Sequence, residues 1–174
     1  MSFLQHWFGK NRKDDKAMLL PLYNAIVAKG RELHWYEQGG VVDSIDGRFE
    51  MIMAILAMVQ IRLEKQPDQA QNLVYLTEIF VDDMDGQLRQ IGIGDMIVGK
   101  HIGKIMSALG GRIGAYRNSI GDPATLGTAL VRNLYRGDEP AASALDHTKK
   151  ELLALHTALD AHSHDSIIQG QIKW

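Results

Sequence analysis

A stretch of almost uninterrupted apolar residues in the first third of the chain constrains the fold more than any other feature. From Phe49 to Leu63 nearly every position is apolar, and the run Met51–Val59 contains no polar residue. This run is far shorter than the roughly 18 residues that a membrane-spanning helix needs. A helix that is apolar on all sides is buried on most of them. The sequence therefore predicts that this segment is the central helix of a bundle, in a protein that is not integral to a membrane.

Helical periodicity also dominates the rest of the chain, and no alternating segments flank a hairpin turn. The pattern predicts helices over about 15–33, 46–65, 69–90, 95–117 and 123–135, and a last helix after Pro140. N-cap residues and breakers separate them: Asp43–Asp46, Pro67, Gly92 with Gly94, and Asp122-Pro123. We therefore expect an all-α fold, a single compact bundle of about six helices over residues 15–174, with a largely buried second helix.

Residues 1–14 form a separate apolar and basic segment. On a helix its large apolar side chains share one face, and four cations follow; the apolar residues are Phe3, Leu4, Trp7 and Phe8. A secretory signal has the reverse order of charge and apolar residues. This order predicts a cytoplasmic chain. The face is typical of a membrane-surface anchor, and the alternatives are that it docks on the protein's own core or is disordered.

Composition and motifs argue against catalysis. Without cysteine there is no thiolate nucleophile or disulfide, and a net charge of −2 gives no long-range attraction to nucleic acid. The stretch Gly94–His101 lacks the Ser or Thr that a phosphate-binding loop needs after its lysine. The histidines near His162 lack the further converging ligands of a zinc site. We expect no metal, no cofactor and no enzyme. One alternative is a Mg²⁺-dependent enzyme on a prenyl-type substrate, suggested only by Asp82, Asp83 and Asp85. Another is a generic peripheral membrane adaptor that binds anionic lipid.

Charge is partitioned between two neighbouring helices. Residues 78–95 hold five acids and one base, whereas residues 96–117 hold four bases and no acid. The two helices either pair across the bundle or line a partner-binding surface, where complementary charge governs orientation. The basic helix also carries many glycines, each costing roughly 1 kcal/mol of helix propensity relative to alanine. We expect close backbone approach to compensate this cost.

Several motifs in order resemble the ubiquinol–cytochrome c chaperone family over about residues 22–135. They are Asp46-Gly47-Arg48-Phe49-Glu50, Phe80–Asp85 with Leu88-Arg89, Gly92–Asp95, Lys100, Gly111-Arg112 and Ala115-Tyr116. The resemblance implies a non-enzymatic, helical assembly factor that binds newly made cytochrome b, with a small partner chaperone and the ribosome as further partners. It also favours a peripheral location on the cytoplasmic face of the inner membrane for this chain. The chain departs from the family at Gln90 and at Leu109-Gly110.

The same motifs supply the candidate partner-binding residues. One group is expected to form a polar network at the corner between the third and fourth helices, either holding that corner or touching the client: Arg48, Asp83, Asp85, Arg89 and Asp95. A second group is expected to contact the partner directly: Lys100, Lys104, Arg112 and Tyr116.

Overall fold

The protein is built from α-helices and their connections throughout the described part of the chain. The computed structural model describes residues 14–90, 92 and 95–174, without the side chains of 95–98 and 101. The element bounds are α2 Leu20–Gly30, α3 His34–Glu37, α4 Ile45–Leu63, α5 Ala70–Gln90, α6 Asp95–Ser119, α7 Pro123–Asn133, α8 Ala142–Ala161 and α9 His164–Ile168. The predicted all-α fold is confirmed. Apart from the short α3 and α9, these are the six helices expected from the sequence.

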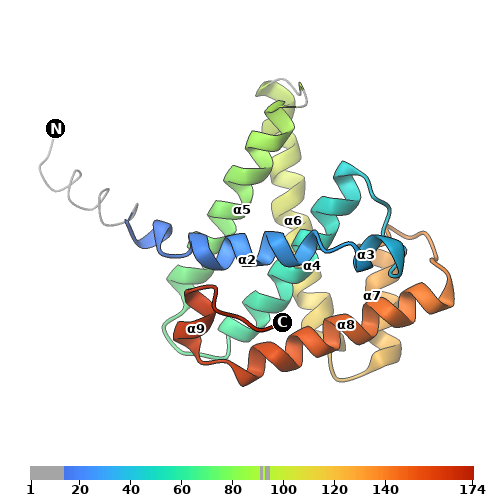
Figure 1. Cartoon of the computed structure of the whole chain (residues 1–174). Helices are drawn as coiled ribbons and strands as arrows, with labels where there is room; N and C mark the ends of the chain where they lie inside the picture. The colour runs from blue at the N-terminus through green and yellow to red at the C-terminus, as the bar shows by residue number, and fades with distance from the viewer. Residues whose placement is uncertain (1–13, 91, 93–94) are drawn as a thin grey trace, which may run out of the picture.

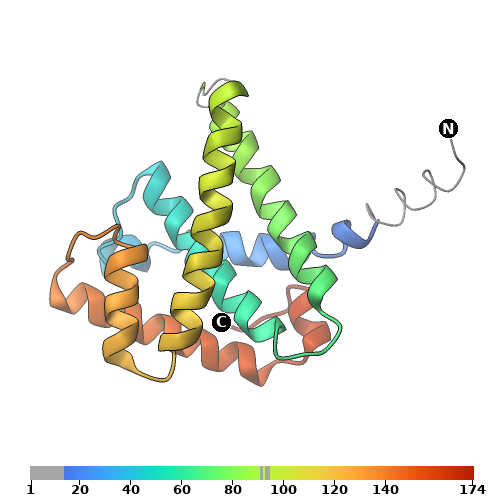
Figure 2. The same ribbon diagram turned by 180° about the vertical axis from the view of Figure 1, so that it is seen from behind.

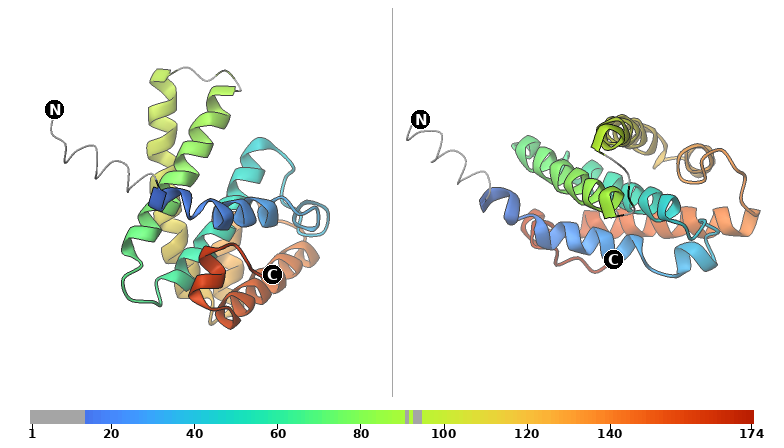
Figure 3. Two further views of the ribbon diagram at one scale, coloured as in Figure 1. Left: turned by 60° about the vertical axis from the view of Figure 1, so that its left-hand side comes forward. Right: turned by 90° about the horizontal axis from the view of Figure 1, so that it is seen from above.

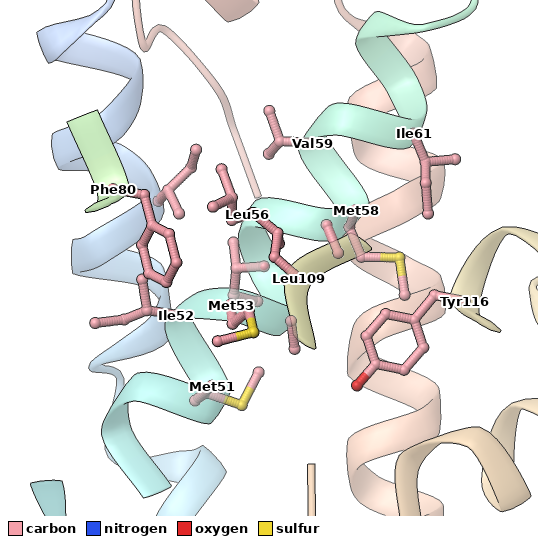
Figure 4. Packing of buried hydrophobic residues seen from close by; sticks show 14 of the residues in the cluster. Met51, Ile52, Met53, Leu56, Met58, Val59, Ile61, Phe80, Leu109 and Tyr116 are labelled. Carbon is pink, nitrogen blue, oxygen red and sulfur yellow. The ribbon is translucent and has the colours of Figure 1, made fainter. Parts of the chain in front are cut away.

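The helix α4 forms the centre of the bundle, as its apolar sequence predicts. Ser44 caps it by accepting a hydrogen bond from the Gly47 amide at 3.1 Å. Every residue from Met51 to Leu63 is buried, and α4 contacts α2, α5, α6 and α8. Figure 4 shows side chains of α4 packed between Phe80 on one side and Leu109 and Tyr116 on the other.

Two polar side chains within this buried stretch have defined partners. Gln60 Nε2 donates to Thr77 Oγ1 of α5 at 2.9 Å. Arg62 donates from Nε to the Leu159 carbonyl at 3.1 Å and from Nη2 to the His162 carbonyl at 3.0 Å. A helix leaves its last carbonyls without intrahelical donors, so Arg62 caps the C-terminus of α8 and ties it to α4.

The other helices lie on two sides of α4. Figure 1 shows α2 and α8 crossing on the near side, and Figure 2 shows α6 and α7 on the opposite side. Seen from above, α4 lies between these layers (Figure 3). The helices α5 and α6 pack against each other, and their joined ends project beyond the rest of the bundle (Figure 1). The end of α5 and the start of α6 therefore lie away from the core.

The first predicted helix is divided in the structure. Residues 14–17 form one helical turn, α2 starts next to Pro21, and α3 follows a break after Gly30. A Cβ on Gly30 would lie 3.0 Å from Ile52 Cγ1. Beyond the break, the buried Trp35 donates from Nε1 to the Lys29 carbonyl at 2.8 Å. Close packing on α4 and this indole contact thus favour a turn over a continuous helix.

The expectation of close backbone approach along α6 is wrong for the described residues. A Cβ placed on any of five glycines would meet no atom of a neighbouring element within 4 Å: Gly99, Gly103, Gly110, Gly111 and Gly114. The helix-propensity cost of these glycines is therefore not offset by packing within the described chain.

Candidate partner-binding surface

Arg48 lies near the start of α4 and forms a local ion pair. Its Nε and Nη2 donate to the two carboxylate oxygens of Asp43, at 2.6 and 3.2 Å. Its guanidinium lies 5.8 Å from the ring centre of Tyr36. The hydrogen bond from Arg48 lowers the pKa of the Asp43 carboxyl. Arg48 thus stabilises the entry to α4 and, contrary to expectation, does not join the acids of α5.

Asp83 connects α5 to α2. It accepts a hydrogen bond from the Tyr23 hydroxyl at 2.6 Å and a second from Gln87 Nε2 at 3.0 Å. Burial and the neighbouring carboxylate both raise the pKa of Tyr23, which keeps the phenol protonated as the donor. The residue therefore holds two helices together, and the expected single network is wrong for Asp83 as it is for Arg48.

The remaining corner residues lie along the end of α5 and the start of α6. Arg89 pairs with Asp85 one turn earlier, with 2.6 Å between Nε and Oδ2. Such an (i, i+4) pair supports the helix locally. The side chain of Asp95 lies outside the described residues. Whether these three residues touch a client stays a prediction.

Lys100 and Lys104 are exposed on α6. Within the described part of the chain neither side chain forms an ion pair. Being one turn apart, they present two cations on one side of the helix. Of the predicted contact residues, these two have the accessibility that binding to a partner requires.

Arg112 and Tyr116 lie in the interior instead. Arg112 is 8% exposed, pairs with Glu50 of α4 through Nη2, and donates from Nη2 to the Asn133 carbonyl at 3.2 Å. Burial raises the pKa of Glu50 against the opposing effect of Arg112, and burial also raises the pKa of Tyr116. Arg112 Nε and the Tyr116 hydroxyl are buried without a hydrogen-bond partner among the described residues. Arg112 therefore links α6 to α4, and neither Arg112 nor Tyr116 is accessible to a partner in this conformation.

The arginines of α6 do not pair with the acids of α5. Arg112 pairs with Glu50, and Arg117 pairs with Glu64 at 2.5 Å, so both contact carboxylates of the α4 region. On α5, Asp82 lies 2.5 Å from the ammonium of Lys16, which is also 3.7 Å from Glu78. The arginines of α6 thus pair with the α4 region, and Asp82 and Glu78 of α5 pair with Lys16 in the helical turn over residues 14–17.

A groove between α5 and α6 was not predicted from the sequence. Its volume is about 570 Å³, and it is lined by Leu73, Val74, Thr77 and Val81 of α5, Met106 of α6, and a charged rim of Lys16, Glu78 and Asp82. Val74 and Met106 are 49% and 43% exposed. The spacing of Val74, Thr77 and Val81 along one face of α5 is the sequence signal for it. This apolar surface is large enough for side chains of a partner.

The acid cluster on α5 does not form a shared site. Asp82 pairs with Lys16, Asp83 accepts from Tyr23, and Asp85 pairs with Arg89 on its own helix. Among the residues that the structure describes, no group of three or more His, Cys, Asp or Glu is arranged to hold a metal. The alternative of a Mg²⁺-dependent enzyme finds no support in this geometry.

The described helices include none that is both long and apolar enough to cross a bilayer. The predicted membrane-surface residues Phe3, Leu4, Trp7 and Phe8 lie outside the described residues.

The fold and the surface together define a class of protein. Asp82, Asp83 and Asp85 each have a partner within the described chain. An apolar groove and two lysines of α6 are exposed, as in a non-enzymatic chaperone. A family model described as "Ubiquinol-cytochrome C chaperone" matches residues 37–174. The chain therefore belongs to the ubiquinol–cytochrome c chaperone family, and the resemblance seen in the motifs is confirmed.

A solved structure supports the same assignment. The chain is similar to the Cbp3 homolog from Brucella abortus, with 29% sequence identity and a TM-score of 0.79. The similarity covers 99% of this chain and 96% of the Brucella chain. A search among curated proteins finds no significant match. Family and fold together give the protein an assembly-factor role for the respiratory bc complex.

Proposed function

We propose that this protein binds newly made cytochrome b during biogenesis of the ubiquinol–cytochrome c reductase. The family match over residues 37–174 is the observation that carries the proposal. Cytochrome b is an apolar membrane protein, so a factor that holds it before assembly needs exposed apolar surface beside polar groups that fix its orientation. The α5–α6 groove supplies apolar surface with a charged rim, and Lys100 and Lys104 are further exposed charges elsewhere on α6.

Lys100 and Lys104 are the proposed partner-contacting cations. They are exposed and unpaired within the described chain, so charge there is available to a client, a small partner chaperone or the ribosome. Arg112, by contrast, is already matched by Glu50 in the interior. We assign the buried pair to holding α6 in position and the lysines to contact.

The proposed location is the cytoplasmic face of the inner membrane. A face of Phe3, Leu4, Trp7 and Phe8 followed by cations fits an interfacial anchor, which combines apolar burial with attraction to anionic lipid. Liposome flotation of the full chain against a variant lacking residues 2–8 tests this part. Equal flotation of the two proteins contradicts the anchor.

The direct experiment combines gene deletion with co-purification. Deleting the gene in the organism of origin should lower cytochrome b and bc-complex activity. Tagged protein purified from mildly solubilised membranes should carry cytochrome b, identified by mass spectrometry. Normal cytochrome b levels in the deletion strain, with no cytochrome b on the tagged protein, would refute the proposal.

Charge reversal on α6 tests the proposed contact. The Lys100→Glu/Lys104→Glu variant should lose cytochrome b from the purified material while keeping its melting temperature, because both side chains are exposed. The control is Lys150→Glu on α8, whose side chain is 81% exposed, and it is compared with the single variants Lys100→Glu and Lys104→Glu, which change the net charge equally. Equal loss in the control would show a general effect of charge and not a site on α6.

A further inference from the structure

The α5–α6 groove combines an apolar floor with an acidic edge. Leu73, Val74 and Val81 supply the floor from α5, and Met106 supplies it from α6. Glu78 and Asp82 lie at the edge, one turn apart on α5. A ligand that fits this groove is apolar on one side and carries positive charge next to its apolar part.

Met106 is the one residue of α6 among the described residues that line this groove, and the face of α6 around it carries little side chain. Gly103 and Gly110 lie three and four residues from Met106, so they share its face of the helix. A Cβ on either glycine would meet no neighbouring element within 4 Å. A segment in the groove could therefore approach the α6 backbone closely enough to seat aromatic rings.

The described chain begins at the edge of this groove. Residues 14–17 form a helical turn, and Lys16 bridges Asp82 and Glu78, at 2.5 and 3.7 Å. The residues before this turn hold an apolar face of Phe3, Leu4, Trp7 and Phe8, and then Lys10, Arg12 and Lys13. Lys16, the last of the four cations that follow the apolar face, thus contacts the acidic edge, and the apolar face lies upstream in the same chain.

The lengths match. From Asp82 to Leu73 the groove follows nine residues of α5, about 13 Å at 1.5 Å per residue. A helix over residues 3–8 is about 9 Å long on the same rise. The five residues 9–13 reach up to about 17 Å when extended, which is enough for the chain to reverse at Asp14 and run back along α5.

From this we propose that residues 1–13 dock in the α5–α6 groove of their own chain, with the Phe3, Leu4, Trp7 and Phe8 face on the apolar floor and the cations beside Glu78 and Asp82. The same face cannot lie in the groove and in a bilayer at once. Occupation of the groove by its own N-terminus therefore covers the apolar surface whenever the segment is not engaged elsewhere.

Because the natural chain has no cysteine, pairs of introduced cysteines test this directly in the full-length protein. Leu4→Cys with Val74→Cys should form an intrachain disulfide under mild oxidation, seen as a faster band on a non-reducing gel. Leu4→Cys with Ser143→Cys is the control, since Ser143 is exposed near the start of α8, away from α5 (Figure 1). We expect crosslinking at least about tenfold faster in the first pair, because a disulfide requires Cα atoms within about 7 Å.

A further variant separates docking from mere tethering. Adding Trp7→Ser/Phe8→Ser to the Leu4→Cys/Val74→Cys pair removes the apolar contact but leaves the connection unchanged, so crosslinking should slow about tenfold. Equal rates in the groove and control pairs, or no effect of the serines, would overturn the proposal. A product of twice the chain mass in place of the intrachain band would also overturn it, because a second copy would then be the occupant. Circular dichroism confirms that each variant is folded, and Val74 is exposed enough for its substitution to be tolerated.

Discussion

Removal of the Arg112 side chain gives the sharpest test of how α6 is held. The guanidinium and the Glu50 carboxylate are only 10% and 15% exposed as side chains. Breaking a buried ion pair by deleting one partner typically costs about 3–5 kcal/mol, because the other charge stays buried and uncompensated. For a chain of this size, about 2–4 °C per kcal/mol gives an expected loss of about 6–20 °C in Tm for Arg112→Ala.

The loss of stability in Arg112→Ala should also be larger at high pH than at low pH. Burial already raises the pKa of Glu50 above its ordinary value of 4.5, and Arg112 opposes this rise. Without Arg112 the pKa of Glu50 in the folded state rises further. The folded state then binds the proton more tightly than the unfolded state, so stability increases as pH falls. The penalty should therefore be largest above the folded-state pKa and shrink as the pH falls towards 4.5.

Thermal unfolding followed by circular dichroism measures the change in Tm, and urea unfolding at about pH 7 and about pH 5 measures the pH dependence of the free energy of unfolding. Arg117→Ala is the matched control on the same helix, since its pair with Glu64 is 47% and 34% exposed and should contribute only about 0–1 kcal/mol. The double substitution Glu50→Gln/Arg112→Met should recover much of the loss, because no charge stays buried. An Arg112→Ala variant that is as stable as the control and insensitive to pH would refute this account.

Four further substitutions probe other contacts, each measured as a change in the free energy of unfolding. Tyr23→Phe removes the hydrogen bond to Asp83 and should cost about 1.5–3 kcal/mol; a loss below that range would mean that the contact does not join α2 to α5. Tyr116→Phe should be neutral or stabilising, because the buried hydroxyl has no partner among the described residues. Gly111→Ala should stabilise by up to about 1 kcal/mol, since its Cβ meets open space. Gly47→Ala should destabilise, because its Cβ would clash with the backbone carbonyl oxygen of Val42. An equal effect at both glycines would contradict the packing described.

The core and most helix boundaries could be predicted because they depend on local patterns. The apolar run Met51–Val59 is buried on every side, and the cap of Ser44 lies within the predicted start of α4. The short α3 and α9 were missed, since helices of four and five residues contain too few turns for periodicity to show.

The arrangement of the charged residues could be predicted only in part, because it depends on which helices meet. The link between Tyr23 and Asp83 joins residues 60 positions apart, and that between Lys16 and Asp82 joins residues 66 apart. Burial of Arg112 and Tyr116 did have a local signal: they follow Leu109 at helical spacing on its inward face. Their charge and motif alone predict exposure like that of Lys100 and Lys104, which is wrong for both residues.

The central position of α4 has a consequence for how the chain can vary in length. Each residue of a helix is turned by about 100° from the one before. Deleting one residue between Met51 and Leu63 would turn the remainder of α4 by that angle and present the wrong side chains to α2, α5, α6 and α8 simultaneously. Arg62 would then be directed away from the end of α8 that it caps. Insertions and deletions should therefore be confined to the connections, and the number of residues in α4 should be the most rigidly fixed dimension of the molecule.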